Sequence, residues 1–251
     1  MNKSTPKVFI ATPMYGGACF APYVKGLLDA TSVLHSHGYS VLFSALVNES
    51  LIPRARNELV RQFLLTDAEY MLFVDADIEF SGEDVLKLIK SDKELICGLY
   101  PKKFIDWKRL NILAKQGYTE LQNYAASYVV NCLDPNTYNP VIDDPIVEIK
   151  HGGTGFMLIK RSVFIKLTPF VRAYRVSTFT DDIPYVKEFF STKIEDGTNY
   201  FMSEDYYFCD LWRQHGGKVH ADLSIKLSHL GTHLFTGDLF LGGANGSASN
   251  N

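Results

Sequence analysis

The sequence has little of what marks a cysteine-built metal cluster, a membrane protein or a nucleic-acid binder. Its four cysteines are scattered and form no CxxC pair, so no zinc spacing is present and free thiols are expected. No segment reaches the ~18 uninterrupted apolar residues of a membrane span, and the N-terminus lacks a signal peptide's apolar stretch. The net charge of −3 argues against nucleic-acid binding through bulk positive charge. We expect a soluble, cytoplasmic protein, in the host cytoplasm if the source is viral.

What is present is the composition of an ordinary globular protein. The chain has 251 residues, of which 46% are hydrophobic and 21% charged. That is enough for one large domain or two small ones. We predict a single domain over residues 1–240. The last residues, 241–251, are small and polar, and we expect them to be disordered.

Segments typical of strands alternate with helical patterns through the first hundred residues. Four segments rich in β-branched and aromatic residues are predicted strands: 8–12, 40–47, 70–74 and 95–100. Between them lie three predicted helices. The first has Val24, Leu27, Leu28, Thr31 and Leu34 on its apolar face, the second follows Pro53 with Leu59, Val60, Phe63 and Leu64 as its apolar stripe, and the third covers 82–90. Ser81 and Asp84 are spaced to form the capping box of the third. This order predicts an α/β fold, with a mostly parallel central sheet flanked by helices on both faces.

The second part of the chain is less regular. We interpret residues 101–146 as an insertion, and 172–200 as a loop region over a site. Two further strands, 147–153 and 155–160, are predicted around a glycine turn. The stretch SEDYYFCDLWRQHG is predicted to begin a helix, with Ser203 as its cap.

Two acids follow directly on the predicted strand 70–74, in the stretch VDAD. Ligands of open parallel sheets bind beyond the carboxyl ends of the strands. Asp75 and Asp77 would lie on the same side if the strand stayed extended. Two close carboxylates repel unless a cation neutralises them, and Mg²⁺ or Mn²⁺ prefers such oxygen ligands. The pattern favours a metal site able to bridge a diphosphate, although an isolated DxD is more often a surface turn.

Several motifs together resemble those of nucleotide-sugar glycosyltransferases of the GT-A fold. The resemblance covers about residues 7–235 and rests on VFIATPMYGG, FVDADIEF as the DxD motif, GGTGFMLIKRSVF, SEDYYFCDLWRQHGG and SHLGTH. The chain most resembles compact family-2-like transferases of bacteria, large viruses and phages. This resemblance implies a Rossmann-like GT-A domain, with a nucleotide-binding half over 7–100 and an acceptor-binding half over 101–240.

The resemblance implies nucleotide contacts at the ends of the first two strands. It implicates Thr12, Pro13 and Tyr15 after the first strand, where Tyr15 could stack on uracil or simply be an exposed loop residue. It implicates Asn48, and less strongly Glu49, after the second strand.

Further donor contacts are implied around the DxD motif and the glycine run. Arg56 is expected near the diphosphate, because guanidinium groups suit phosphate geometry. Asp75 is expected to face the ribose, and Ala76 to keep the turn small. Gly153 and Thr154 are expected beside the donor sugar, unless the glycines only form a hairpin turn. Weaker candidates adjoin Arg56: Arg54 and Asn57.

The resemblance also assigns a metal site and a base. Asp77 is the implied direct ligand of Mn²⁺ or Mg²⁺, and His229 is the best match for a second ligand. The substitute candidates for the second ligand are His233 and His151. Asp205 is the first candidate for the base that deprotonates the acceptor and Glu204 the second, although both acids also suit the first turn of a helix.

The predicted function is transfer of a sugar from a nucleotide-sugar donor, with a UDP-sugar expected, to an acceptor hydroxyl. A carboxylate base suggests inversion, while retention stays open. The acceptor is left open among a glycan, a protein glycan and a modified nucleobase, and Lys102, Lys103, Trp107 and Lys108 are candidate acceptor contacts or a solvated face.

Two alternatives are weighed against this function. A sugar-nucleotide nucleotidyltransferase is disfavoured because TPMYGGACFAP contains no lysine or arginine. A non-catalytic nucleotide-sugar-binding module is disfavoured because the candidate metal and base residues are intact.

Overall fold

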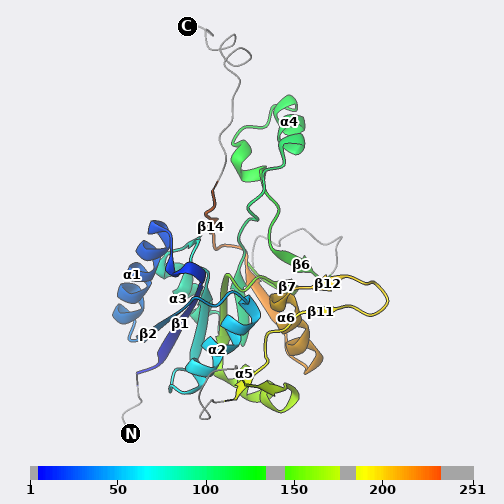
Figure 1. Cartoon of the computed structure of the whole chain (residues 1–251). Helices are drawn as coiled ribbons and strands as arrows, with labels where there is room; N and C mark the ends of the chain where they lie inside the picture. Colours follow the sequence, from blue (N-terminus) through cyan, green and yellow to red (C-terminus); the bar gives the residue numbers. More distant parts are fainter. Residues whose placement is uncertain (1–4, 134–144, 176–184, 233–251) are drawn as a thin grey trace.

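An eight-stranded sheet forms the centre of the molecule (Figure 1). The computed structural model describes residues 5–133, 145–175 and 185–232. The predicted tail and the candidate ligand His233 lie outside these ranges. In spatial order the strands are β2 (Ser40–Val47), β1 (Lys7–Met14), β3 (Tyr70–Val74), β8 (Phe156–Lys160), β5 (Leu95–Gly98), β13 (Val219–Asp222), β7 (Ile146–Gly152) and β6 (Val130–Cys132).

The strand directions confirm the predicted α/β fold. Strands β2, β1 and β3 are parallel neighbours, and so are β5 and β13. Strand β8 is antiparallel to both β3 and β5, and β7 is antiparallel to both β13 and β6. Only β8 and β7 therefore oppose the common direction of this sheet, within the part of the chain that the structure describes.

The glycine run does not form a hairpin between its two flanking strands. Strand β8 inserts between β3 and β5, whereas β7 lies between β13 and β6. Every residue of β8 up to Ile159 is buried, as expected for a strand covered on both faces. The Gly152–Gly155 stretch is therefore a crossover inside the sheet.

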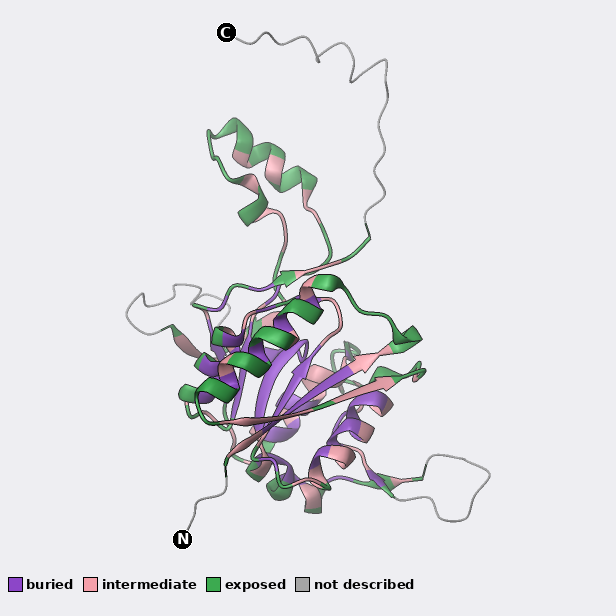
Figure 2. Ribbon diagram, turned by 90° about the vertical axis from the view of Figure 1, so that its left-hand side faces the viewer, coloured by how far each residue is buried: buried purple, intermediate pink, exposed green. Residues whose placement is uncertain are grey.

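Helices cover both faces of the sheet, as Figure 2 shows by burial. Helices α1 (Ala21–Ser36) and α3 (Gly82–Lys90) pack on one face, and α2 (Ile52–Leu64), α5 (Arg161–Leu167) and α6 (Glu204–Gln214) on the other. Alternate residues of β1 enter the two cores: Val8 and Ile10 join one, and Phe9 and Ala11 the other.

The buried face of α1 differs from the predicted one. Val24 and Leu28 are 41% and 68% exposed. The helix buries Leu34 of the predicted face together with Tyr23, Gly26 and Ala30, which lie outside that face. Gly26 decides the orientation, because a Cβ there would lie only 2.6 Å from the carbonyl oxygen of Phe80. The small residue lets α1 approach the chain that follows the DxD turn.

Residues 101–129 form an arm that leaves the body between β5 and β6 (Figure 1). The arm carries α4 (Trp107–Lys115) and the 3-10 turn η2 (Leu121–Tyr124). Its base is closed by a hydrogen bond of 2.8 Å from the Lys102 amide to the Ser127 carbonyl. No residue from 101 to 133 is buried. Residues 101–129 of the predicted insertion 101–146 thus project from the body, Val130–Cys132 join the sheet as β6, and residues 134–144 lie outside the described ranges.

Short ladders complete the described fold. Strand β4 (Ile78–Glu79) pairs with β14 (Ser228–His229), β9 (Ala173–Tyr174) with β10 (Val186–Lys187), and β11 (Lys193–Ile194) with β12 (Phe201–Met202). The other two 3-10 turns are η1 (Tyr15–Gly17) and η3 (Thr168–Phe170). Within the described ranges, no helix has the length and apolar character needed to cross a bilayer.

Candidate functional site

A cleft of about 440 Å³ opens at the carboxyl ends of β1, β3 and β5. This is the sheet edge where ligands of parallel sheets bind. The cleft brings together eight of the residues that the sequence singles out: Pro13, Tyr15, Arg56, Asp75, Ala76, Asp77, Glu204 and Asp205. They come from strand ends, from α2 and from the first turn of α6.

The DxD motif forms a turn rather than a continuation of the strand. Strand β3 ends at Val74, and the Ile78 amide donates to the Asp75 carbonyl at 3.1 Å. The condition that the chain stay extended is therefore not met. Asp75 faces Arg56, and Asp77 faces Lys103 and His229. Each carboxylate is thus paired with a different basic side chain, which offsets the repulsion between the two acids.

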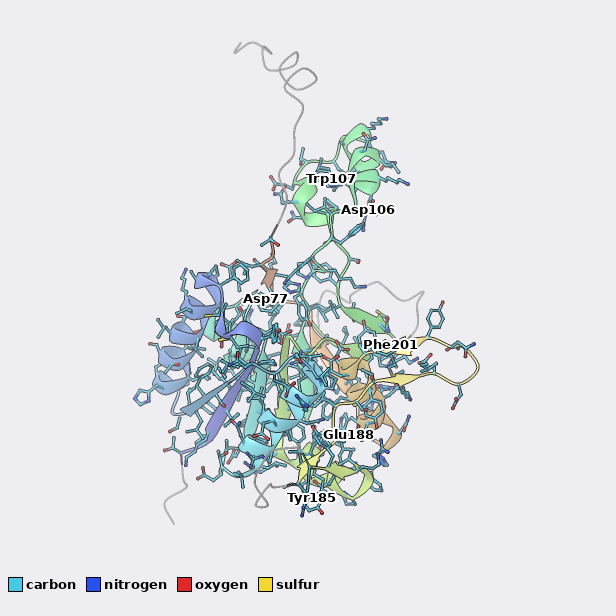
Figure 3. All side chains as sticks on the ribbon, in the orientation of Figure 1. Asp77, Asp106, Trp107, Tyr185, Glu188 and Phe201 are labelled. Carbon is cyan, nitrogen blue, oxygen red and sulfur yellow. The ribbon has the colours of Figure 1, made fainter. Side chains whose placement is uncertain are left out.

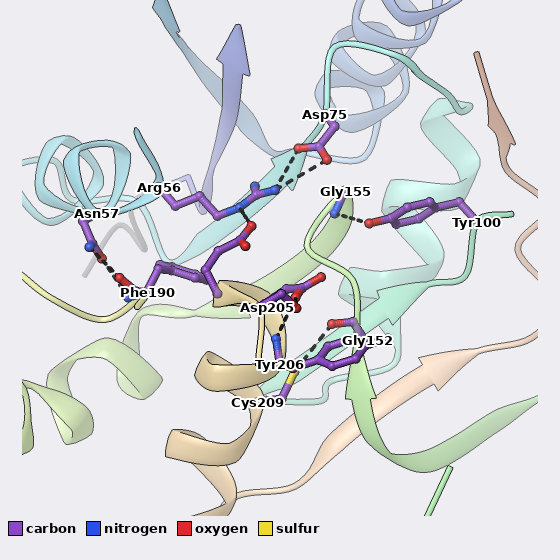
Figure 4. Close-up of polar contacts among 12 residues, drawn as sticks. Arg56, Asn57, Asp75, Tyr100, Gly152, Gly155, Phe190, Asp205, Tyr206 and Cys209 are labelled. Carbon is purple, nitrogen blue, oxygen red and sulfur yellow. Dashed lines mark hydrogen bonds and ion pairs between the residues drawn. The ribbon is translucent and has the colours of Figure 1, made fainter. Parts of the chain in front are cut away.

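Arg56 is a buried cation at the floor of the cleft (Figure 4). Its side chain is 4% exposed and lies 3.2 Å from both the Asp75 and the Glu204 carboxylates. Burial acts to lower the pKa of Arg56, but the two carboxylates outweigh it and raise that pKa. Its Nη1 is buried and has no hydrogen-bond partner among the described residues. An unpaired donor on a buried charge is costly, so this group is suited to a ligand oxygen.

Asp77 lies between the Lys103 ammonium and the His229 ring, which come from distant parts of the chain. Its carboxylate contacts the Lys103 ammonium from the arm, and its Oδ1 lies 3.4 Å from His229 Nε2. The β4–β14 ladder and a 2.8 Å bond from the Leu230 amide to the Asp77 carbonyl hold His229 there. Burial raises the pKa of Asp77, but His229 and Lys103 outweigh it and the pKa is lowered.

The geometry of His229 suits a metal ligand. Its Nδ1 lies 2.9 Å from the Pro101 carbonyl oxygen. That oxygen can only accept, so Nδ1 donates to it and Nε2 is the ring nitrogen that faces Asp77. A divalent cation would be held between Nε2 and the Asp77 carboxylate. Among the residues described, no group of three or more Asp, Glu, His or Cys gathers as a metal site, so these two would be the protein's contribution.

Asp205 is positioned at the start of α6 (Figure 4). It accepts hydrogen bonds from the Ser203 hydroxyl and from the Tyr206 amide, the latter at 2.8 Å. Burial is the main cause that raises the pKa of Asp205, and the charge of Glu204 adds to it. A carboxylate with a raised pKa is a stronger base than an exposed one. Glu204, by contrast, is engaged by Arg56.

The glycine run Gly152–Gly155 lies outside the cleft lining and contacts Tyr100, a residue of that lining. Gly153 and Thr154 are buried and do not line the cleft. The Gly155 amide donates to the Tyr100 hydroxyl at 3.0 Å, and a side chain at Gly153 or Gly155 would collide with the Tyr100 ring. Tyr100 itself lines the cleft. In this structure the run positions a tyrosine, and its predicted contact with the donor sugar stays a prediction.

Other candidates near the nucleotide end lie outside the cleft lining. Thr12 is buried, and its hydroxyl bonds the Tyr23 hydroxyl at 2.6 Å. Asn48 is exposed, with a left-handed φ of 60°. Arg54 forms an ion pair with Glu49. Their predicted roles as nucleotide contacts are not tested by these positions.

Two weaker candidates have structural partners. The Asn57 amide makes two hydrogen bonds of 2.8 Å with the backbone of Phe190. His151 is buried, and its Nε2 lies 2.8 Å from Asp210. Neither lines the cleft.

Sequence reasoning missed several cleft residues and one pairing. The additional lining residues are Met14, Ala18, Phe20, Ile52 and Tyr100. Tyr100 had a local signal, because it is the last residue of the predicted strand 95–100 at the same sheet edge. The sequence predicts Lys103 as an acceptor contact or as part of a solvated face, and nothing local links it to Asp77, 26 residues earlier.

Comparison with known proteins gives only distant likenesses. No family model and no curated protein matches the sequence. Among solved structures, A197 from STIV is 17% identical, with 90% of this chain and 86% of that chain covered and a TM-score of 0.48. GalNAc-T7, solved with UDP, GalNAc and Mn²⁺, is 12% identical, with 90% and 44% covered and a TM-score of 0.43.

A third solved structure is a glycosyltransferase involved in glycosylation of the major capsid of PBCV-1. It is 10% identical, with 64% of this chain and 62% of that chain covered and a TM-score of 0.31. Likenesses this distant do not establish a reaction, so the function has to be inferred from the residues of the cleft.

Proposed function

We propose that the protein is a metal-dependent glycosyltransferase of the GT-A type that uses a nucleotide-sugar donor, with a UDP-sugar as the favoured one. The observation that carries this proposal is the meeting of Asp75, Asp77, Arg56 and Asp205 in one cleft at the carboxyl ends of parallel strands. The half over 7–100 supplies most of the nucleotide contacts. The half over 101–240 supplies the base, the histidine and the acceptor side.

Different cleft residues would contact different parts of the donor. Tyr15, 72% exposed at the cleft rim, is available to stack on the base. Asp75 would accept hydrogen bonds from ribose hydroxyls. The free Nη1 of Arg56 is directed to an oxygen of the donor.

A diphosphate can approach Asp77 only if a cation separates the two negative groups. Asp77 and His229 would hold Mn²⁺ or Mg²⁺, and the bound ion would supply charge stabilisation for the leaving diphosphate. Lys103 must then move off the Asp77 carboxylate or share it. His229 keeps its orientation through Pro101 in either case.

The chemical step assigned to the chain is a proton transfer. Asp205 takes the proton of the acceptor hydroxyl while that oxygen bonds to the anomeric carbon. The bond from the anomeric carbon to the diphosphate oxygen breaks, and the nucleoside diphosphate leaves with that electron pair. Attack from the face opposite the leaving group gives inversion. The raised pKa of Asp205 suits this role.

The test compares hydrolysis of UDP-sugars with and without Mn²⁺ in two variants of the same segment. Asp77→Ala should lower activity by about 10²-fold or more, because the charge on the leaving group is no longer offset. Glu79→Ala is the matched control, since Glu79 is exposed and outside the cleft lining. Undiminished activity of Asp77→Ala would refute the metal role.

The same assay separates the alternatives. Release of pyrophosphate from a nucleoside triphosphate would instead support a nucleotidyltransferase. The loop Pro13–Ala18 argues against that alternative, because it has no basic side chain. Tight UDP binding without hydrolysis or transfer, across several donors, would support a binding module.

A further inference from the structure

A second cleft, of about 520 Å³, lies at the base of the arm. Its walls come from the start of the arm, from η2 and its C-terminal flank, and from the strand-end segment around His229. The lining includes Lys102, Lys103, Phe104, Trp107 and His229. Figure 3 shows Trp107 on the arm, above the part of the body that carries Asp77.

This arm cleft meets the donor cleft at Asp77. Lys103 and His229 line the arm cleft, and both contact the Asp77 carboxylate, which lines the donor cleft. Gly231 makes room for this link, because a Cβ there would lie 2.9 Å from Lys103 Cδ. A ligand in the arm cleft would therefore lie next to the site proposed for the diphosphate.

The lining of the arm cleft combines positive charge with aromatic surface. Lys102 and Lys103 line it, and no Asp or Glu does. The Lys103 ammonium is engaged by Asp77, whereas Lys102 has no ion-pair partner among the residues described. Asp106, which lies in the sequence between the lining residues Ile105 and Trp107, accepts from the Arg109 amide at 3.0 Å as the cap of α4 and does not line the cleft. The free charge of the cleft is thus positive.

Two aromatic rings are held exposed in the same cleft. Phe104 and Trp107 are 61% and 65% exposed, although they are large apolar side chains. Ligand sites commonly combine aromatic walls with a few placed polar groups. A flat ring against Trp107 and an anionic group at Lys102 would satisfy both features at once.

We propose that the arm cleft is the acceptor site, and that its acceptor is a sugar carrying a carboxylate or phosphate group. Calling this cleft an acceptor site rests on the proposed function. The binding of an acidic sugar there is a separate property that can be measured by itself. Trp107 contacts the sugar ring, and Lys102 pairs with its anionic group. The acceptor hydroxyl then points toward the junction at Asp77.

The test is a fluorescence titration without donor or metal. The protein has two tryptophans, of which Trp212 is fully buried, so Trp107 reports on the cleft. Wild type and Trp107→Phe are titrated with glucose, glucuronic acid, glucose 6-phosphate and inorganic phosphate at constant ionic strength. We expect both acidic sugars to change the Trp107 signal at concentrations about tenfold lower than glucose, a difference of ~1.4 kcal/mol. Inorganic phosphate should leave that signal unchanged.

Matched lysine variants decide the role of charge. Lys102→Gln should remove the roughly tenfold preference for acidic sugars, and Lys115→Gln, at an exposed position of α4 outside the cleft lining, should retain it. Equal binding of glucose and acidic sugars, or full preference in Lys102→Gln, would overturn the proposal. A Trp107 response to phosphatidylglycerol vesicles but to no sugar would also overturn it, in favour of a lipid surface.

Each of the two proposals can be refuted without the other. Acidic-sugar binding without any Mn²⁺-dependent donor hydrolysis would leave the arm cleft as a sugar site and refute the glycosyltransferase. Donor hydrolysis without acidic-sugar binding would refute the arm cleft alone.

Discussion

At the scale of residues, the cleft is organised as pairs of opposite charge. Asp75 and Glu204 both pair with Arg56, while Asp77 pairs with Lys103 and also contacts the His229 ring. Asp205 differs, because its direct contacts are a hydroxyl and an amide rather than a cation. At Asp205 no direct cation outweighs the effect of burial, so its pKa is raised, and a raised pKa makes this carboxylate a better proton acceptor.

Replacing Asp205 by asparagine should separate activity from stability. Transfer should fall by about 10²–10⁴-fold, the usual contribution of a general base. The raised folded pKa means that protonation of Asp205 favours the folded state, a contribution lost as pH rises through that pKa. At neutral pH, Asp205→Asn should therefore be at least as stable as wild type in thermal denaturation. Asp196→Asn, at an exposed position, is the control and should change neither property.

The pH profile of transfer provides a second signature of Asp205. The base acts as a carboxylate, so kcat/KM should fall with decreasing pH as Asp205 is protonated. Its raised pKa places this fall above the ~3.9 of an ordinary aspartate. The profile is measured with Mn²⁺ saturating at each pH. A rate that stays flat down to pH ~4 would argue against Asp205 as the base.

Lys103 should compete with a metal for Asp77. The Lys103→Gln variant loses the ammonium that contacts the carboxylate, so Mn²⁺ should bind several-fold more tightly. Binding is measured by electron paramagnetic resonance of free Mn²⁺, without donor. Lys108→Gln is the control. Weaker Mn²⁺ binding in Lys103→Gln would mean that this lysine supports the ion rather than replacing it.

At the scale of elements, the sequence predicts the features that depend on residues close together in the chain, such as helix caps and the ends of strands. The capping box of α3 is confirmed: the Asp84 amide donates to the Ser81 hydroxyl oxygen at 3.3 Å, and the Ser81 amide donates to Asp84 at 3.0 Å. The DxD acids, Arg56 and the α6 acids could be placed at one edge because each begins or ends a predicted element.

Long-range contacts account for what the sequence did not predict. His229 reaches Asp77 through the β4–β14 ladder, between segments about 150 residues apart in the sequence. Strand β8 inserts between β3 and β5, which no local pattern of the glycine run specifies. Even the buried face of α1 depends on a partner, Phe80, that lies 54 positions beyond Gly26. Hydrophobic periodicity alone selects Val24 and Leu28, which are exposed.

The packing of α1 should depend on Gly26. In Gly26→Ala, the added methyl group would meet the Phe80 carbonyl and ring at 2.6–2.8 Å. Overpacking of this kind costs about 1–3 kcal/mol, which exceeds the helix propensity gained from alanine, about 1 kcal/mol. Chemical denaturation should show a net loss of stability, while Lys25→Ala, at the neighbouring exposed position, stays near wild type. Unchanged or increased stability of Gly26→Ala would show that α1 can shift without cost.

At the scale of the whole molecule, the body and the arm have different physical bases. The body holds both hydrophobic cores, and neither contains a buried residue from 101–133. The arm is held by its closed base, where the Val129 amide also donates to the Tyr100 carbonyl at 3.2 Å. The arm should therefore contribute recognition rather than stability.

Replacing residues 104–126 by a flexible linker of about four residues tests this division. The linker joins Lys103 to Ser127, whose carbonyl already accepts the Lys102 amide, so a hairpin-length connection suffices. The melting temperature should change by no more than ~4 °C, the effect of ~1 kcal/mol in a chain of this size. Mn²⁺-dependent UDP-sugar hydrolysis should persist, because the donor cleft stays intact, while binding of acidic sugars and transfer to them should be lost. A large fall in melting temperature would show instead that the arm helps to hold the fold, and retained transfer would place the acceptor elsewhere on the body.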